Sequence, residues 1–195
     1  TLEISFASFW GWTSFWPERI ITKSEANILY EIDGQPALNL YKKYLGEKAN
    51  QLPQASLLYP LNVTPEGKKE PVVRTILGID NEKQSMTLAG DVPENSKVQL
   101  MMASVDAIAE GANEAAQRAM QNRKAAPQLA LLVSCVGRKL VMNQRVEEEI
   151  ERVQEVIGNS TAITGFYSYG EMAPFANNTF CDLHNQTMTL TLISE

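Results

Sequence analysis

Apolar and polar residues alternate along several short stretches of this chain, and three longer stretches repeat their apolar residues every three to four positions. Alternation with period two is typical of a half-buried β-strand, whereas the longer spacing is typical of an amphipathic helix. Alternation or a short apolar run between turn residues predicts strands over residues 2–9, 19–23, 27–32, 57–63, 72–79, 85–89, 97–103, 129–135, 165–175 and 187–193.

Helical spacing predicts helices over residues 36–45, 105–124 and 144–157. Pro36 is tolerated at the start of the first, and Gly46 is a typical stop. The second is rich in alanine, which allows close packing on a sheet. In the third, an apolar stripe faces inward and four glutamates are expected to face water. That stripe consists of Val146, Ile150, Val153 and Ile157.

The order of these elements sets the expected fold class. Residues 72–103 are expected to form an antiparallel meander, and Pro60 indicates an edge or bulged strand over residues 57–63. Residues 129–135 are apolar without alternation, which is typical of a strand buried on both faces. Strand, helix, strand, helix and strand over residues 97–168 resemble a layer with βαβ units. We therefore expect an α+β (mixed α/β) fold, with a mixed, largely antiparallel sheet and a few amphipathic helices packed on it.

The composition and charge of the chain restrict the classes of function that it can have. The 195 residues are 44% hydrophobic, and 17 basic against 23 acidic side chains give a formal charge of −6, which argues against nucleic-acid binding. Two cysteines and one histidine are too few for a disulfide framework or a zinc site, so no metal or cofactor is expected. With so few cysteines, a reducing, cytoplasmic setting is expected. The chain lacks a membrane-spanning run, and because it begins at Thr1 we expect it to be a piece of a longer protein.

Cys135, Gly137 and Arg138 follow the apolar strand 129–135, and the carboxyl ends of such strands are where α/β layers bind ligands. The Arg138 guanidinium is suited to a ligand carboxylate, and a structural salt bridge is the competing interpretation. A Cys135 thiolate with His184 as base would be a nucleophile, but a buried cysteine that packs as a small hydrophobe is favoured.

The stretch Gly165-Phe166-Tyr167-Ser168-Tyr169-Gly170-Glu171-Met172-Ala173-Pro174-Phe175 concentrates further candidates. Tyr167 and Tyr169 would share one strand face and line a pocket, or pack the sheet. Glu171 beside Gly170 would pair with a ligand amine, cap backbone amides or pair with Arg138. His184 and Asn185 are ligand contacts or residues that fix the start of the last strand. We assign no catalytic residue; the candidate ligand-binding residues are Arg138, Glu171, Tyr167, Tyr169, His184, Cys135 and Asn185.

Several motifs in order resemble the carboxyl-terminal half of the FIST family, named for F-box and intracellular signal transduction proteins. They are Asp33-Gly34-Gln35-Pro36-Ala37, Leu40-Tyr41-Lys42-Lys43-Tyr44-Leu45-Gly46, Ser134-Cys135-Val136-Gly137-Arg138, Gly165-Phe166-Tyr167-Ser168-Tyr169-Gly170-Glu171 and His184-Asn185-Gln186-Thr187. The resemblance runs from about residue 10 to the end. It implies that residues 33–195 are the carboxyl-terminal domain and that residues 1–32 are connecting strands from a missing amino-terminal half.

The resemblance also implies a function: a non-catalytic sensory domain that binds a small molecule, with amino acids or their derivatives as the implied ligand class. The implied partners are that ligand, the missing amino-terminal half and a signalling output domain or protein. Two alternatives stay open. One is a thiol-dependent hydrolase that uses Cys135 and His184. The other is a protein-interaction platform, in which Trp10, Trp12 and Trp16 form an interface anchor instead of an aromatic cage or the end of a core.

Overall fold

The computed structural model describes residues 1–174 and 181–195. Backbone contacts divide the chain into two compact units, the first comprising Thr1–Trp12 and Ala103–Glu195 and the second Thr13–Met102. The described residues combine helices with sheets that are mostly antiparallel, which confirms the expected α+β class. The boundary expected between residues 32 and 33 separates the two halves of the family rather than these two units, and it stays a prediction.

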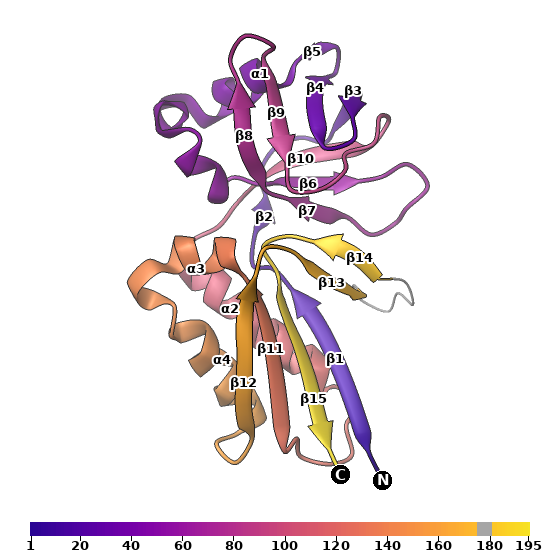
Figure 1. Cartoon of the computed structure of the whole chain (residues 1–195), viewed down its shortest axis with the longest axis vertical. Helices are drawn as coiled ribbons and strands as arrows, with labels where there is room; N and C mark the ends of the chain where they lie inside the picture. The colour runs from indigo at the N-terminus through magenta and orange to yellow at the C-terminus, as the bar shows by residue number, and fades with distance from the viewer. Residues whose placement is uncertain (175–180) are drawn as a thin grey trace. The chain divides into compact units, whose positions relative to one another are not determined.

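The first unit is built on a four-stranded mixed sheet with the order β1-β15-β11-β12 (Figure 1). β1 is Glu3–Phe9, β15 is Met188–Ser194, β11 is Leu129–Cys135 and β12 is Ala162–Ser168. β11 and β12 are parallel, and the other two pairings are antiparallel. The strand–helix–strand crossover expected between β11 and β12 is therefore confirmed.

Three helices connect the strands of this unit: α2 (Val105–Met120), α3 (Val136–Met142) and α4 (Glu148–Ile157). α2 and α4 pack on one face of the sheet (Figure 1). The alanines of α2 allow a close approach, and they form the core with Leu132, Leu190 and Val153. α2 ends at Met120, four residues earlier than predicted. Arg123 lies beyond the helix and donates to Ser5, Ser194 and the Leu192 carbonyl.

The sequence predicted that both faces of β11 are buried, but the face opposite the helices is partly exposed. Burial alternates along this strand, and Leu129 and Leu131 are 37% and 36% exposed. The prediction of a strand buried on both faces was therefore wrong. The apolar run does form a strand, as predicted. However, the described helices of this unit pack on one face of the sheet only.

The stretch predicted as a single strand over residues 165–175 is two strands. β12 ends at Ser168, and β13 (Glu171–Pro174) then forms a hairpin with β14 (Cys181–His184). Tyr169 and Gly170 make the bend, where glycine lets the chain pass close to Leu183. Phe175 lies outside the described residues.

The second unit contains a larger, antiparallel arrangement with the order β7-β6-β10-β3-β4-β9-β8, to which short strands β2 and β5 are added. Its elements are β2 (Thr13–Ser14), β3 (Arg19–Glu25), β4 (Ile28–Ile32), β5 (Gln35–Pro36), α1 (Ala37–Leu45), β6 (Leu61–Thr64), β7 (Val72–Arg74), β8 (Ile76–Asp80), β9 (Ser85–Leu88) and β10 (Lys97–Met102). α1 begins after Pro36 and stops at Gly46, as predicted.

Two expectations for this unit were wrong. β8 and β9 do form a hairpin, but β10 pairs with β6 and β3 instead of continuing a meander. β6 begins after Pro60, so the proline does not interrupt a ladder, and β6 is flanked on both sides by β7 and β10 rather than lying at an edge. Residues 54–57, by contrast, form a 3₁₀ turn.

The tryptophan-rich segment is largely internal. Trp12 and Trp16 are almost fully buried, and Trp16 packs against Tyr44 in the second unit. This burial supports the interpretation that the tryptophans close a core. None of the helices in the described ranges has the length and apolar character needed to cross a bilayer.

Candidate functional site

Arg138 and Glu149 form a fully buried ion pair in the first unit. Arg138 lies in α3, and its Nε donates to Glu149 Oε2 over 3.0 Å. Its other nitrogens donate to the carbonyl oxygens of Trp10 at 2.5 Å and Ile108 at 2.8 Å. A buried charge is costly unless it is paired and hydrogen-bonded, and these contacts meet that need. The arrangement makes Arg138 a structural cation that orients Glu149.

Two hydroxyl groups complete the surroundings of Glu149. Tyr167 donates to Glu149 Oε1 over 2.8 Å, and Ser134 donates to Oε2 over 3.2 Å. Burial and the negative charge of Glu149 raise the pKa of the Tyr167 phenol, so this hydroxyl stays protonated. The carboxylate therefore accepts from one cation and two hydroxyls, which come from α3, β11 and β12.

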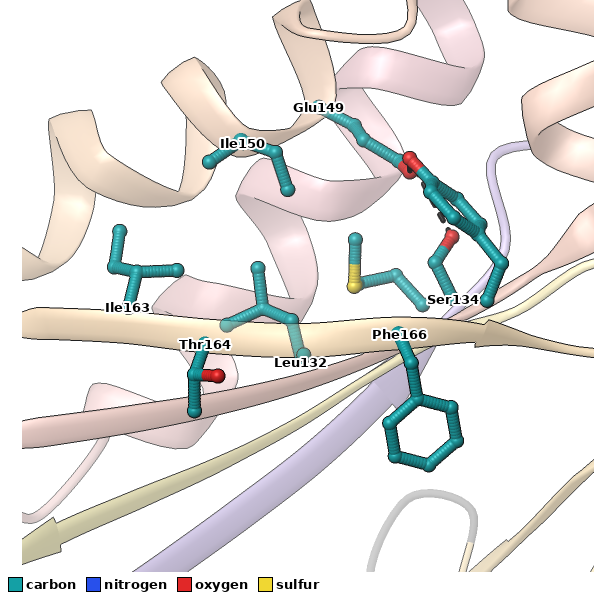
Figure 2. Close-up of a pocket in the computed structure, with 10 residues that line it drawn as sticks. Leu132, Ser134, Glu149, Ile150, Ile163, Thr164 and Phe166 are labelled. Carbon is teal, nitrogen blue, oxygen red and sulfur yellow. Dashed lines mark hydrogen bonds between the residues drawn. The ribbon is translucent and has the colours of Figure 1, made fainter.

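A cavity of about 290 Å³ opens beside this group, between α4 and β12. Its walls are mostly apolar, and Glu149 and Ser134 lie together at one end (Figure 2). Tyr167 joins them there through its hydrogen bond to Glu149. The full lining is Leu132, Ser134, Glu149, Ile150, Ile163, Thr164, Gly165, Phe166, Tyr167 and Met188. An apolar cavity of this size with a few convergent polar groups is the usual form of a small-ligand site.

Gly165 lies on the part of β12 that borders the cavity. A Cβ built at this position would collide with the carbonyl oxygen of Leu132 on the neighbouring strand. Glycine therefore allows β12 to pass close to β11, and it leaves the space between Ile163 and Tyr167 without a side chain.

Glu171 occupies a second polar cluster, at the start of β13. It is buried, and its carboxylate accepts from Ser168 at 2.6 Å and from the Thr187 hydroxyl at 2.9 Å. Desolvation by burial raises the pKa of Glu171, while these hydrogen bonds act in the opposite direction. The contacts tie together the end of β12, the start of β13 and the start of β15. This arrangement supports the interpretation of Glu171 as a structural carboxylate.

Cys135 lies at the end of β11, and its thiol is buried. Burial, followed by the negative charge of Glu171, raises the pKa of Cys135 to about 11. A nucleophilic cysteine needs the opposite shift, because the thiolate is the reactive form. Burial and this raised pKa favour the interpretation of Cys135 as a packing residue over the thiol-hydrolase alternative.

The remaining predicted site residues do not line the cavity. His184 is buried, and its Nε2 lies 3.1 Å from the Ala173 carbonyl oxygen, so the tautomer protonated there bridges β14 and β13. Asn185 is also buried and donates to the His184 carbonyl. Tyr169 is 89% exposed at the bend after β12. The expectation that Tyr167 and Tyr169 share a strand face was therefore wrong.

The structure brings only Tyr167, among the predicted site residues, to the cavity wall. The residue that the sequence interpretation missed is Glu149, which was not among the candidate site residues. Its spacing carried the signal: Glu149 is three residues after Val146 and four before Val153, so it lies on the apolar stripe of α4. A glutamate on that stripe requires a buried partner, and the partner is Arg138.

Within residues 1–174 and 181–195, no three histidine, cysteine, aspartate or glutamate side chains gather closely enough to hold a metal ion. The cavity itself presents apolar walls and the hydroxyl groups of Tyr167 and Ser134, which the buried Arg138–Glu149 pair holds in position.

A family model described as the FIST C domain matches residues 37–174, well over half of the chain. No curated protein and no solved structure matches it. The matched range includes β12 and all of α4, and therefore most of the cavity wall. FIST C domains are associated with signal transduction. The chain therefore belongs to the FIST C family of signalling domains, as its motifs indicated.

Proposed function

We propose that this chain is a non-catalytic sensory domain that binds a small molecule in the cavity between α4 and β12. The observation that carries the proposal is the cavity of about 290 Å³, whose apolar walls end at the Glu149–Tyr167–Ser134 group. This volume is close to the lower end of the range for small-molecule pockets, so the ligand is about the size of one amino acid.

The polar end of the cavity indicates what the ligand carries. Tyr167 and Ser134 donate their hydroxyl hydrogens to the fully buried Glu149, so their oxygens remain as acceptors, and Arg138 balances the charge of Glu149 at 3.0 Å. A ligand therefore needs an N–H or O–H donor but not a full positive charge. Leu132, Ile150 and Ile163 favour an aliphatic group at the other end. Amino acids and their derivatives with aliphatic side chains combine both features.

The family association supports the setting of this activity. In our proposal, the domain works in the cytoplasm as part of a longer signalling protein, beside an amino-terminal FIST half and an output domain or protein. Of the candidate ligand-binding residues, Tyr167 contacts the ligand directly. Arg138 acts through Glu149, while Glu171, His184, Cys135 and Asn185 support the strands that end near the cavity.

A thermal-shift screen tests this proposal with the common amino acids and their N-acetyl and amide derivatives. A ligand that binds only the folded chain raises the melting temperature with concentration, by mass action. Ile150→Phe fills the cavity and is expected to abolish the shift. Leu140→Phe, at an exposed position in α3, is the matched control and should preserve it. Absence of a shift with every compound would contradict the proposal.

A further inference from the structure

The outer edge of β12 is an unusual surface for a folded domain. β12 is the last strand of its sheet, and its sequence Ala-Ile-Thr-Gly-Phe-Tyr-Ser contains neither a charge nor a proline. Exposed edge strands normally carry such residues, because an unprotected edge pairs with other strands. The strand at the opposite end, β1, carries Glu3, which accepts from the backbone N–H groups of Lys124 and Ala125.

The hydrogen-bonding groups of this edge can be assigned. The N–H of Ala162 donates to the Gln128 carbonyl over 2.9 Å, on the β11 side. Successive residues of a strand direct their backbone groups to opposite edges. Ile163, Gly165 and Tyr167 therefore direct their N–H and C=O groups outward, where no strand of the described residues pairs with them.

The cavity follows the same edge. Its lining includes five consecutive residues, 163–167. Thr164 and Phe166 point to the face of the sheet opposite α4, whereas Ile163 points toward Ile150 (Figure 2). Because the lining residues of β12 are consecutive although their side chains alternate between the two faces, the backbone of β12 itself borders the cavity. A strand added beside β12 would thus place alternate side chains between β12 and α4.

The exposed surface of α4 beside the cavity carries acidic side chains, whereas the polar end of the cavity carries a cation, because Lys139 Nζ lies 4.9 Å from the ring centre of Tyr167. Among the glutamates of this region, Glu148 pairs with Arg145 and Glu155 pairs with Arg152. Glu147 and Glu151, on either side of the cavity-lining Ile150, are exposed and form no ion pair within the described residues. Two unmatched carboxylates beside an apolar cavity complement a basic partner.

We propose that β12 binds an extended basic peptide segment as an added strand. One aliphatic side chain of the peptide enters the cavity, and basic side chains two positions before and after it face Glu147 and Glu151. Because side chains two positions apart share a strand face, this spacing places all three toward α4. Main-chain hydrogen bonds supply affinity, and the cavity supplies specificity. The inference rests on the proposed function, since the cavity that accepts an amino-acid-sized group would accept one residue of the peptide.

Calorimetric titration with the peptide acetyl-Lys-Thr-Leu-Thr-Lys-amide tests the inference. Binding is expected, and the peptide acetyl-Glu-Thr-Leu-Thr-Glu-amide should bind at least about tenfold more weakly. Two N-methylated peptides test the strand pairing, one methylated at Leu and the other at both Thr residues. Alternate amides point to opposite edges, so one of the two should lose about tenfold or more in affinity and the other little. Equal affinity of the two methylated peptides would overturn the proposal.

Variants of the chain test the acidic surface of α4. Glu147→Lys/Glu151→Lys should weaken binding of the basic peptide by about tenfold. Glu47→Lys/Glu82→Lys makes the same charge change at exposed positions of the second unit and should leave the affinity unchanged. If the two double variants weakened binding equally, the proposed contacts of Glu147 and Glu151 with the basic side chains of the peptide would be wrong.

Further outcomes separate this inference from the proposed function. Binding of leucine amide without binding of any peptide would overturn the inference and keep the small-molecule site. Absence of binding by either, together with no thermal shift for any compound of the screen, would overturn both. A dimer in sedimentation that the peptide does not dissociate would also overturn the inference, because a second copy of the chain would then occupy the edge.

Discussion

Arg138 Nε donates to Glu149 Oε2 across 3.0 Å, and neither side chain is exposed to solvent. The pair joins α3 to α4 at the polar end of the cavity. Through it, a residue that does not line the cavity determines the position and charge balance of one that does. The geometry at the polar end of the cavity therefore depends on this pair. The energetic coupling between its two residues can be measured.

Removal of one partner should destabilise the chain strongly. Arg138→Met leaves Glu149 buried without its cation, and Glu149→Leu leaves Arg138 without its carboxylate. Each is expected to lower the free energy of unfolding by about 3–5 kcal/mol, because an unpaired charge remains inside. The double variant Arg138→Met/Glu149→Leu should recover part of the loss. Urea unfolding of the four proteins measures the coupling.

An exposed pair provides the control for this cycle. Arg152 Nη1 lies 2.9 Å from Glu155 Oε2, with about half of each side chain exposed. Arg152→Met should change stability little, because solvent screens such pairs. If Arg138→Met were no more destabilising than Arg152→Met, the structural role of Arg138 would be wrong.

Glu171 should make the stability depend on pH in a defined direction. Burial raises its pKa above the ordinary value of 4.5, so the folded chain holds this proton to higher pH than the unfolded chain. The resulting stabilisation is present below pH 4.5 and is lost as the pH rises through the folded pKa.

The variant Glu171→Gln isolates this effect, since an amide keeps an acceptor for Ser168 and Thr187 but does not titrate. The free energy of unfolding of the original chain minus that of Glu171→Gln should fall as the pH rises above 4.5. Carboxyl groups with lowered pKa values, such as Asp33 and Asp80, occur in both proteins and cancel. A difference that stays flat or rises with pH would show that burial does not dominate at Glu171.

The two cysteines should differ in reactivity. Cys181 is exposed, whereas Cys135 is buried with a pKa of about 11. In Cys181→Ser, the remaining thiol should react slowly with a chromogenic disulfide at neutral pH in the native chain, and rapidly after unfolding in guanidinium. In Cys135→Ser, the exposed thiol should react rapidly without unfolding. Rapid native reaction of Cys135 would instead favour the thiol-dependent hydrolase.

The sequence predicted most of the local structure of the first unit. The alternation in residues 2–9, the alanine stripe of α2 and the apolar run of β11 each have a local cause, and each element is present. Strand partners depend on contacts between distant residues. β10 was therefore expected in a meander with β9, although in the structure it pairs with β6 and β3.

The candidate site shows the same division. The motif around Gly165 and Tyr167 directed attention to β12, which borders the cavity, because glycine and aromatic residues are concentrated there. Glu149 is buried because α4 packs so that this side chain pairs with Arg138 of α3. In the sequence, only the position of Glu149 on the apolar stripe of α4 indicated that it is buried. Tyr169 was misplaced because the chain bends at Gly170, a tertiary feature that period-two spacing does not contain.

The central claim is that the cavity between α4 and β12 binds the ligand, and methyl NMR tests it most directly. The isoleucine methyl groups of Ile150 and Ile163 line the cavity, whereas Ile21 and Ile76 lie in the core of the second unit. During titration with the compound that gives the largest thermal shift, the Ile150 and Ile163 signals should move together and saturate, while those of Ile21 and Ile76 stay in place. Saturable shifts confined to Ile21 and Ile76, or no shift at Ile150 and Ile163, would contradict the account.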